Sequence, residues 1–161
     1  MGMVDLVLAA MDRHYLSEDM QESGSKAIAS CAAMGDEIEA RVGAQGGIEH
    51  VITAMRAHPR TVGVQAGCCE ALAALTKHNA DNRVKVGGTM ELSGIQCVIQ
   101  AMRLHLERVE VQESACVALA HFTIKNDVNK QKVLLWDGRD AIEAALKCHP
   151  DNDAMKKSGR M

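Results

Sequence analysis

The chain has 161 residues, of which 47% are apolar and 24% charged, and its formal net charge is −3. This apolar share is enough for a buried core and excludes a disordered chain. Three aromatic residues and no excess of Lys and Arg argue against nucleic-acid binding, which relies on base stacking and phosphate contacts.

The sequence also excludes a membrane-spanning chain, because it has no run of about 18 apolar residues. Its six cysteines lack the spacing of metal sites or of secreted disulfide frameworks. We therefore expect a reduced chain in the cytoplasm, with the nucleus as the alternative.

An internal repeat organises the sequence. Four segments, AAMDRH, TAMRAH, QAMRLH and AALKCH, share one pattern, and their anchor residues are separated by 44, 47 and 44 positions: Met11, Met55, Met102 and Leu146. Nine residues after each anchor stands a second mark: Met20-Gln21, Val64-Gln65, Val111-Gln112 and Met155-Lys156. Self-similarity at such a period is typical of a repeat architecture.

Each period is predicted to be helical. Residues 3–14 match a helix that recurs at 48–55 and 95–102, where apolar residues follow the i, i+3, i+4, i+7 spacing of one helix face. A longer apolar stripe follows, for example over 64–75 and 111–122. A short helix is then expected at 36–42, 82–86 and 129–133, before Gly47, Gly94 and Gly138, which we expect to let the chain turn.

These residues carry a family resemblance. The segment GGIEHVITAMRAHPRTVGVQAGCCEALAALTKHNADNRVKV resembles an armadillo repeat. The AMR-x-HP and VQ-x-GC patterns are similar to the arrays of protist armadillo proteins and leucine-rich-repeat kinases. The resemblance covers the chain from Val4 to about Gly159.

The predicted fold is therefore all-α: a right-handed armadillo-like α-solenoid of three repeats plus a partial fourth. The whole chain, 1–161, is expected to form one domain, with repeats at about 3–45, 46–92 and 93–136 and a partial repeat at 137–159.

In armadillo proteins the third helices line a concave groove that binds extended peptides, often through a ladder of asparagines. That column holds Ser30, Ala74 and His121 here, so the resemblance does not extend to the ladder. The groove positions expected from helical spacing are Lys26, Ser30, Met34, Glu70, Ala74, His78, Val117, His121 and Lys125. A merely solvated face is the alternative for this surface.

Two other segments leave alternatives open. The first helix is apolar almost all round, and it either folds back on the chain or packs on a second copy or on further repeats through Val4, Leu6, Val7 and Leu8. Trp136 either anchors a partner or covers the end of the last repeat. In that repeat Arg139 and Glu143 replace isoleucines, which predicts a solvated cap.

No pattern supports catalysis, a cofactor or a metal. His14, His58, His105 and His149 recur once per period, too far apart for one zinc ion, and are expected at helix ends. Cys68 and Cys69 point about 100° apart on one helix, which favours packing over redox chemistry.

The sequence therefore predicts a non-catalytic protein-protein interaction module or scaffold that binds a protein or extended peptide along the concave surface. The alternatives are a regulatory or targeting segment of a larger enzyme and a nuclear-transport-type peptide receptor. The latter would need more acids than Glu70, the only one among the expected groove positions.

Overall fold

The computed structural model describes residues 2–89 and 92–159, and within them every regular element is an α-helix. The predicted all-α class is confirmed. The helices are α1 (Met3–Arg13), α2 (Glu18–Ala32), α3 (Asp36–Ala44), α4 (Gly47–Ala57), α5 (Val62–Thr76), α6 (Ala80–Gly87), α7 (Gly94–Leu104), α8 (Val109–Thr123), α9 (Asp127–Leu135), α10 (Gly138–Cys148) and α11 (Asp153–Ser158).

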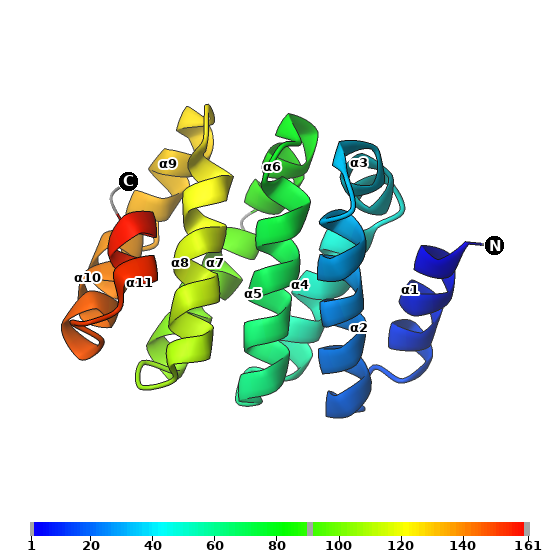
Figure 1. Ribbon diagram of the computed structural model, residues 1–161, viewed down its shortest axis with the longest axis horizontal. Coiled ribbons are helices and arrows are strands. Elements are labelled where there is room, and N and C mark those ends of the chain that lie inside the picture. Colours follow the sequence, from blue (N-terminus) through cyan, green and yellow to red (C-terminus); the bar gives the residue numbers. More distant parts are fainter. Residues whose placement is uncertain (1, 90–91, 160–161) are drawn as a thin grey trace.

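The helices lie in rows that follow the chain (Figure 1). The 15-residue helices α2, α5 and α8 stand side by side, with α5 packed between the other two. Helices α1, α4, α7 and α10 pack in order beside them, and the short helices α3, α6 and α9 lie along one edge. Helices one period apart are therefore neighbours in space.

Polar side chains cap the first turn of several of these helices. The side chains of Asn79 and Asn126 accept hydrogen bonds from the backbone N–H groups of Asn82 and Asn129, three residues on. Such N-caps satisfy amide groups that have no partner within the helix. The short helices begin two residues before the predicted ranges in α6 and α9, because the sequence pattern did not show these caps.

The apolar stripes form one core. Met55 and Met102 occupy equivalent buried positions and are 2% and 1% exposed, and the long helices contribute Leu72, Leu119 and Phe122. Full burial of such side chains contributes about 1.5–3 kcal/mol each. Because each helix covers the next, the core runs through all periods without a break.

The predicted role of the glycines needs a correction. The positive φ at the turn before α4 belongs to Gly46 (88°), and before α10 to Asp137 (54°). Gly47 and Gly138 lack a side chain for another reason: a Cβ there would lie within 3 Å of Val42 or Val133. These glycines let the short helix and the next helix pack closely, and the residue before them makes the turn.

One buried glutamine per period joins two helices. Its side-chain amide nitrogen donates to two carbonyl groups at the end of the preceding helix, over 2.9–3.0 Å: Gln21 to Met11 and His14, Gln65 to Met55 and His58, and Gln112 to Met102 and His105. The glutamine column seen in the sequence thus caps the helix that carries the anchor methionine.

We expect Gln65→Met, which keeps the side-chain length but removes the amide, to lower the free energy of unfolding by about 1–3 kcal/mol. The carbonyl group of Met55 loses the hydrogen bond from the amide, and that of His58 keeps only the one from the backbone N–H of Thr61. Urea denaturation measures the loss. The exposed Gln100 supplies the matched control: Gln100→Met should change stability by less than about 0.5 kcal/mol. Equal effects of the two substitutions would contradict this role of Gln65.

Candidate functional site

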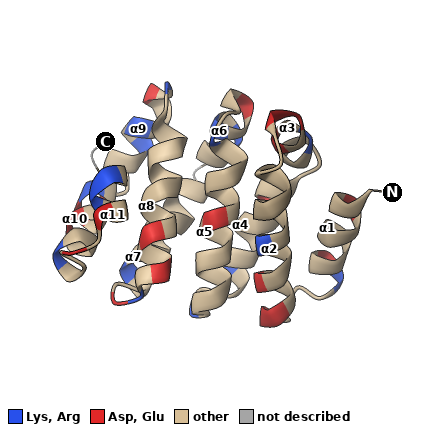
Figure 2. Cartoon of the chain, in the orientation of Figure 1, with Lys and Arg blue, Asp and Glu red and all other residues tan. Residues whose placement is uncertain are grey.

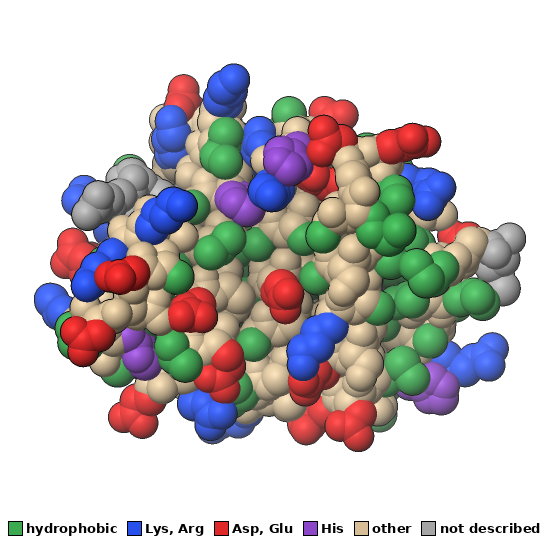
Figure 3. All heavy atoms as spheres, in the orientation of Figure 1, with side chains coloured by type: hydrophobic (Ala, Val, Ile, Leu, Met, Phe, Trp, Pro, Cys, Tyr) green, Lys and Arg blue, Asp and Glu red, His purple; other side chains and the backbone are tan. Residues whose placement is uncertain are grey.

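A groove of about 750 Å³ runs across α2, α5, α8 and α11, on the face shown in Figure 3. Its lining comes from these four helices and from the residue before α8: Glu22, Lys26, Val62, Gly63, Ala66, Gly67, Glu70, Ala73, Arg108, Glu110, Glu113, Ser114, Val117 and Ala154. Four helices one period apart thus contribute to one surface.

Small and apolar residues form the floor of this groove. Gly67 has no side chain, and a Cβ there would lie 3.5 Å from the backbone oxygen of Glu22. Ala66 and Val117 are half-buried and pack against the core. At this position α5 and the backbone of α2 are therefore close enough for a Cβ to reach van der Waals contact.

The rim of the groove is acidic. Lys26 pairs with Glu22, and this hydrogen bond raises the pKa of the lysine. Arg108 pairs with Glu110 at 2.8 Å and lowers the pKa of that carboxyl group. Figure 2 shows the acidic residues on α5 and α8.

The two remaining carboxylates of the groove are those of Glu113 and Glu70. Glu113 accepts a hydrogen bond from the side-chain amide of Asn152. Glu70 is exposed and has no hydrogen bond or ion pair with any described residue. The groove therefore carries four carboxylates and two cations, both of which are already paired.

The structure brings together three of the nine expected groove residues. Lys26, Glu70 and Val117 line the groove. Ala74 is half-buried against the core, and the hydroxyl of Ser30 donates to the backbone oxygen of Lys26 within its own helix.

The other four expected residues lie toward the far ends of the long helices. Met34 lines a separate cavity beside α1. One ring nitrogen of His121 lies 2.8 Å from the backbone oxygen of Ala73. His78 pairs with Asp36, and Lys125 follows α8 with a φ of 49°. Helical spacing thus placed three residues on the face that carries the groove but extended the set past the groove.

Sequence reasoning missed the acids of the rim. Glu22 lies one helical turn before Lys26, and Glu113 one turn before Val117. The same i, i+4 spacing, continued toward the helix starts, would have found both. Arg108 and Glu110 belong to the turn before α8 and its first residues, where loop conformation decides which way the side chains point.

The recurring histidines form a series of contacts between periods. Each ring Nε2 lies 2.7–2.8 Å from a backbone oxygen in the loop of the preceding period: His58 at Tyr15, His105 at Pro59 and His149 at Leu106. In every pair the acceptor is the residue that comes directly after the recurring histidine of the preceding period in the sequence. His14 is exposed and its ring has no such partner among the described residues.

Asp36, Glu39 and His78 hold the only group of three potential ligand atoms found within 4.8 Å of one another in the described ranges. Glu39 is buried, and its Oε1 accepts from the backbone N–H groups of His78 and Asn79 at 3.0 and 2.9 Å. This carboxylate therefore caps the turn between α5 and α6.

Burial controls the chemistry of the cysteines. Cys68 is fully buried, which raises the pKa of its thiol to about 12, although a hydrogen bond with Ser25 acts in the opposite direction. Burial also raises the pKa of Cys116 to about 11 and that of Cys69 well above its usual value. Cys148 is exposed.

The N-terminal helix is partly covered within the chain. Val4 and Leu8 belong to the core, each 6% exposed. Val7 is half-buried and Leu6 is 53% exposed. A surface for self-association on α1 would therefore use Leu6 and Val7, with Val4 and Leu8 beneath them.

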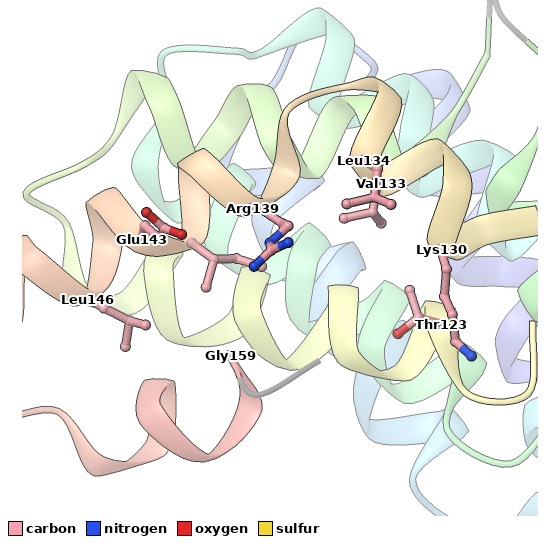
Figure 4. Close-up of a pocket in the computed structure, with 9 residues that line it drawn as sticks. Thr123, Lys130, Val133, Leu134, Arg139, Glu143, Leu146 and Gly159 are labelled. Atoms are coloured by element: carbon pink, nitrogen blue, oxygen red, sulfur yellow. The ribbon is translucent and has the colours of Figure 1, made fainter. Parts of the chain in front are cut away.

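A second cavity, of about 380 Å³, lies at the other end (Figure 4). Val133 and Leu146 form its apolar side, and Arg139 and Glu143 of α10 also line it. Trp136, which precedes α10 in the sequence, is half-buried and packs against the core. Its backbone oxygen accepts a hydrogen bond from the Arg103 side chain.

Comparisons of the chain with protein-family models, with curated proteins and with solved structures give no match. Among the described helices, none combines the length and the apolar character needed to cross a membrane.

We expect thiol reagents to distinguish these cysteines. At pH 8, N-ethylmaleimide should label Cys148 rapidly and leave Cys68, Cys69 and Cys116 unmodified until the protein unfolds, because the thiolate is the reactive form. Mass spectrometry of tryptic peptides reads out the sites. Rapid labelling of Cys68 in the folded protein would contradict its burial.

The raised thiol pKa values also predict a dependence of stability on pH. The unfolded chain ionises its thiols near pH 9, whereas the folded chain keeps Cys68 and Cys116 protonated. Their contribution is thus fully present below pH 9, and the free energy of unfolding falls as the pH rises toward about 11. Urea denaturation of Cys68→Ala should show a smaller fall than the unsubstituted protein over this range.

Proposed function

We propose that the chain is a non-catalytic protein-interaction module built as a right-handed armadillo-like α-solenoid, with three repeats and a partial fourth in one domain. Two observations support the architecture: the order of α2, α5 and α8, and the recurrence of the same glutamine and histidine contacts in successive periods.

The observation that carries the functional proposal is the groove with its apolar floor and the unpaired Glu70. Packed helices lie about 8–10 Å apart, so the groove spans about 20–30 Å, which six to nine residues of extended chain would cover. The ligand we propose is an extended protein segment with small or apolar residues and a Lys or Arg opposite Glu70.

The acidic rim favours a basic ligand because two of its four carboxylates, those of Glu70 and Glu113, form no ion pair with a described cation. This feature brings the nuclear-transport-type receptor back as a second candidate, although the asparagine ladder is replaced by Ser30, Ala74 and His121. A regulatory or targeting segment of a larger enzyme would use the groove in the same way. The cytoplasm or nucleus is the proposed location.

The absence of catalysis is also part of the proposal. The thiols of the adjacent residues Cys68 and Cys69 are fully buried and held in the protonated form, which is the unreactive one. They support the structure as small apolar side chains.

A displayed library of random nine-residue peptides tests the proposal, and we expect selection to enrich Lys and Arg beside small apolar residues. Glu70→Gln should weaken binding of a selected peptide about fivefold, because one charge pair near a surface contributes up to about 1 kcal/mol. Fluorescence anisotropy measures the affinity, which should also fall with added salt.

The matched control is Glu49→Gln, the same charge change at an exposed position of α4 outside the groove. It should leave peptide affinity unchanged. Failure to select any peptide, or equal losses from the two substitutions, would refute the assignment of this groove as the binding site.

A further inference from the structure

The two ends of the molecule expose surfaces that the middle periods use against each other. On α1 and α2, the side chains of Val7, Ala10, Met20 and Ala27 are half-buried. Their equivalents one period on are at most 2% exposed: Val51, Ala54, Val64 and Ala71. We call Val7, Ala10, Met20 and Ala27, together with the exposed Leu6, the N-terminal face.

The opposite end shows the complementary change. Leu146 is half-buried, whereas the equivalent Met55 and Met102 are 2% and 1% exposed because the following period covers them. Together with Val133, Arg139 and Glu143 it lines the 380 Å³ cavity, and Lys157 of α11 lies exposed at the same end. We call these five residues the C-terminal face.

From these two faces we infer that one molecule binds a second copy head to tail, with the N-terminal face of one against the C-terminal face of the other. The contacts within the chain fix the register. Each histidine contacts the backbone oxygen of the residue that comes after the histidine of the preceding period. In the same register, His14 of the second copy would contact the backbone oxygen of Pro150, which follows His149 in the first copy.

The same register places opposite charges together. Within the chain, Gly63 of α5 lies directly beside the carboxylate of Glu22 in the preceding period. Asp19 of the first period is the equivalent of Gly63, and Lys157 of the last period is the equivalent of Glu22. Both are exposed and neither has an ion pair with another described residue. In the stacked pair they meet as an ion pair.

The overall charge distribution favours the same partner. Residues 1–44 contain eight Asp or Glu and three Lys or Arg, whereas residues 124–161 contain six Asp or Glu and eight Lys or Arg. The opposite net charges of the two ends favour the head-to-tail orientation, and the like charges of two identical ends disfavour their contact. A head-to-tail contact uses different surfaces on the two partners, so it can extend beyond two copies.

Sedimentation velocity of the whole protein from about 1 µM to about 1 mM tests the inference. The average mass should rise with concentration past that of two chains. Ala10→Arg should abolish the rise by inserting a long side chain into the contact. Its matched control is Ala9→Arg, on the neighbouring exposed position of the same helix, which should leave association unchanged.

A charge exchange tests the register. Asp19→Lys and Lys157→Glu should each weaken association about three- to tenfold, and the two together should restore it, because the pair is then reversed. Lys156→Glu is the matched control at the C-terminal end. Circular dichroism of each variant checks that helical content is kept.

Two results would overturn the inference. One is a mass of a single chain at every concentration. The other is association that stops at two copies and is unaffected by Lys157→Glu, since this would indicate a symmetric contact between two α1 helices. The peptide-binding experiment is independent, because neither Ala10 nor Asp19 lines the groove.

Discussion

Burial of each period against its neighbours is the constraint on which the rest of the structure depends. A helix with one apolar stripe cannot cover that stripe alone, and the short period offers few other elements to cover it. Met55 and Met102 are buried because α5 and α8 pack in front of them and the following helices pack beside them. Every other feature, from the glutamine caps to the groove, is positioned by this stacking.

The stacking also explains how the floor of the groove and its acidic rim arise. The first halves of the long helices carry residues that are small at the point of contact, such as Gly67, so that neighbouring backbones approach. Charged side chains at the next exposed positions then gather over the shared surface. The acidic rim is thus a result of repeating one helix with Glu at corresponding or nearby places, as Glu22 and Glu113 show.

The sequence was sufficient to predict the helices and the core, because both depend on periodic apolar spacing. The burial of Met55, Leu72 and Val98 follows directly from it. The limits of the groove could not be predicted, because they depend on how far each helix extends before the next loop. His121 illustrates this: it lies on the expected face, yet its ring contacts the backbone of α5.

The histidine contacts have a consequence for how such a chain can change in length. The acceptor of each histidine is a backbone oxygen, supplied by Tyr15, Pro59 or Leu106. The contact between two periods therefore does not depend on which side chain the acceptor residue carries. The glutamine bonds, by contrast, close within one period. Duplication or deletion of one period, between corresponding residues of two periods, would therefore keep each glutamine together with its two acceptors. At the new boundary between periods, the histidine would again lie next to a backbone oxygen that can accept its hydrogen bond.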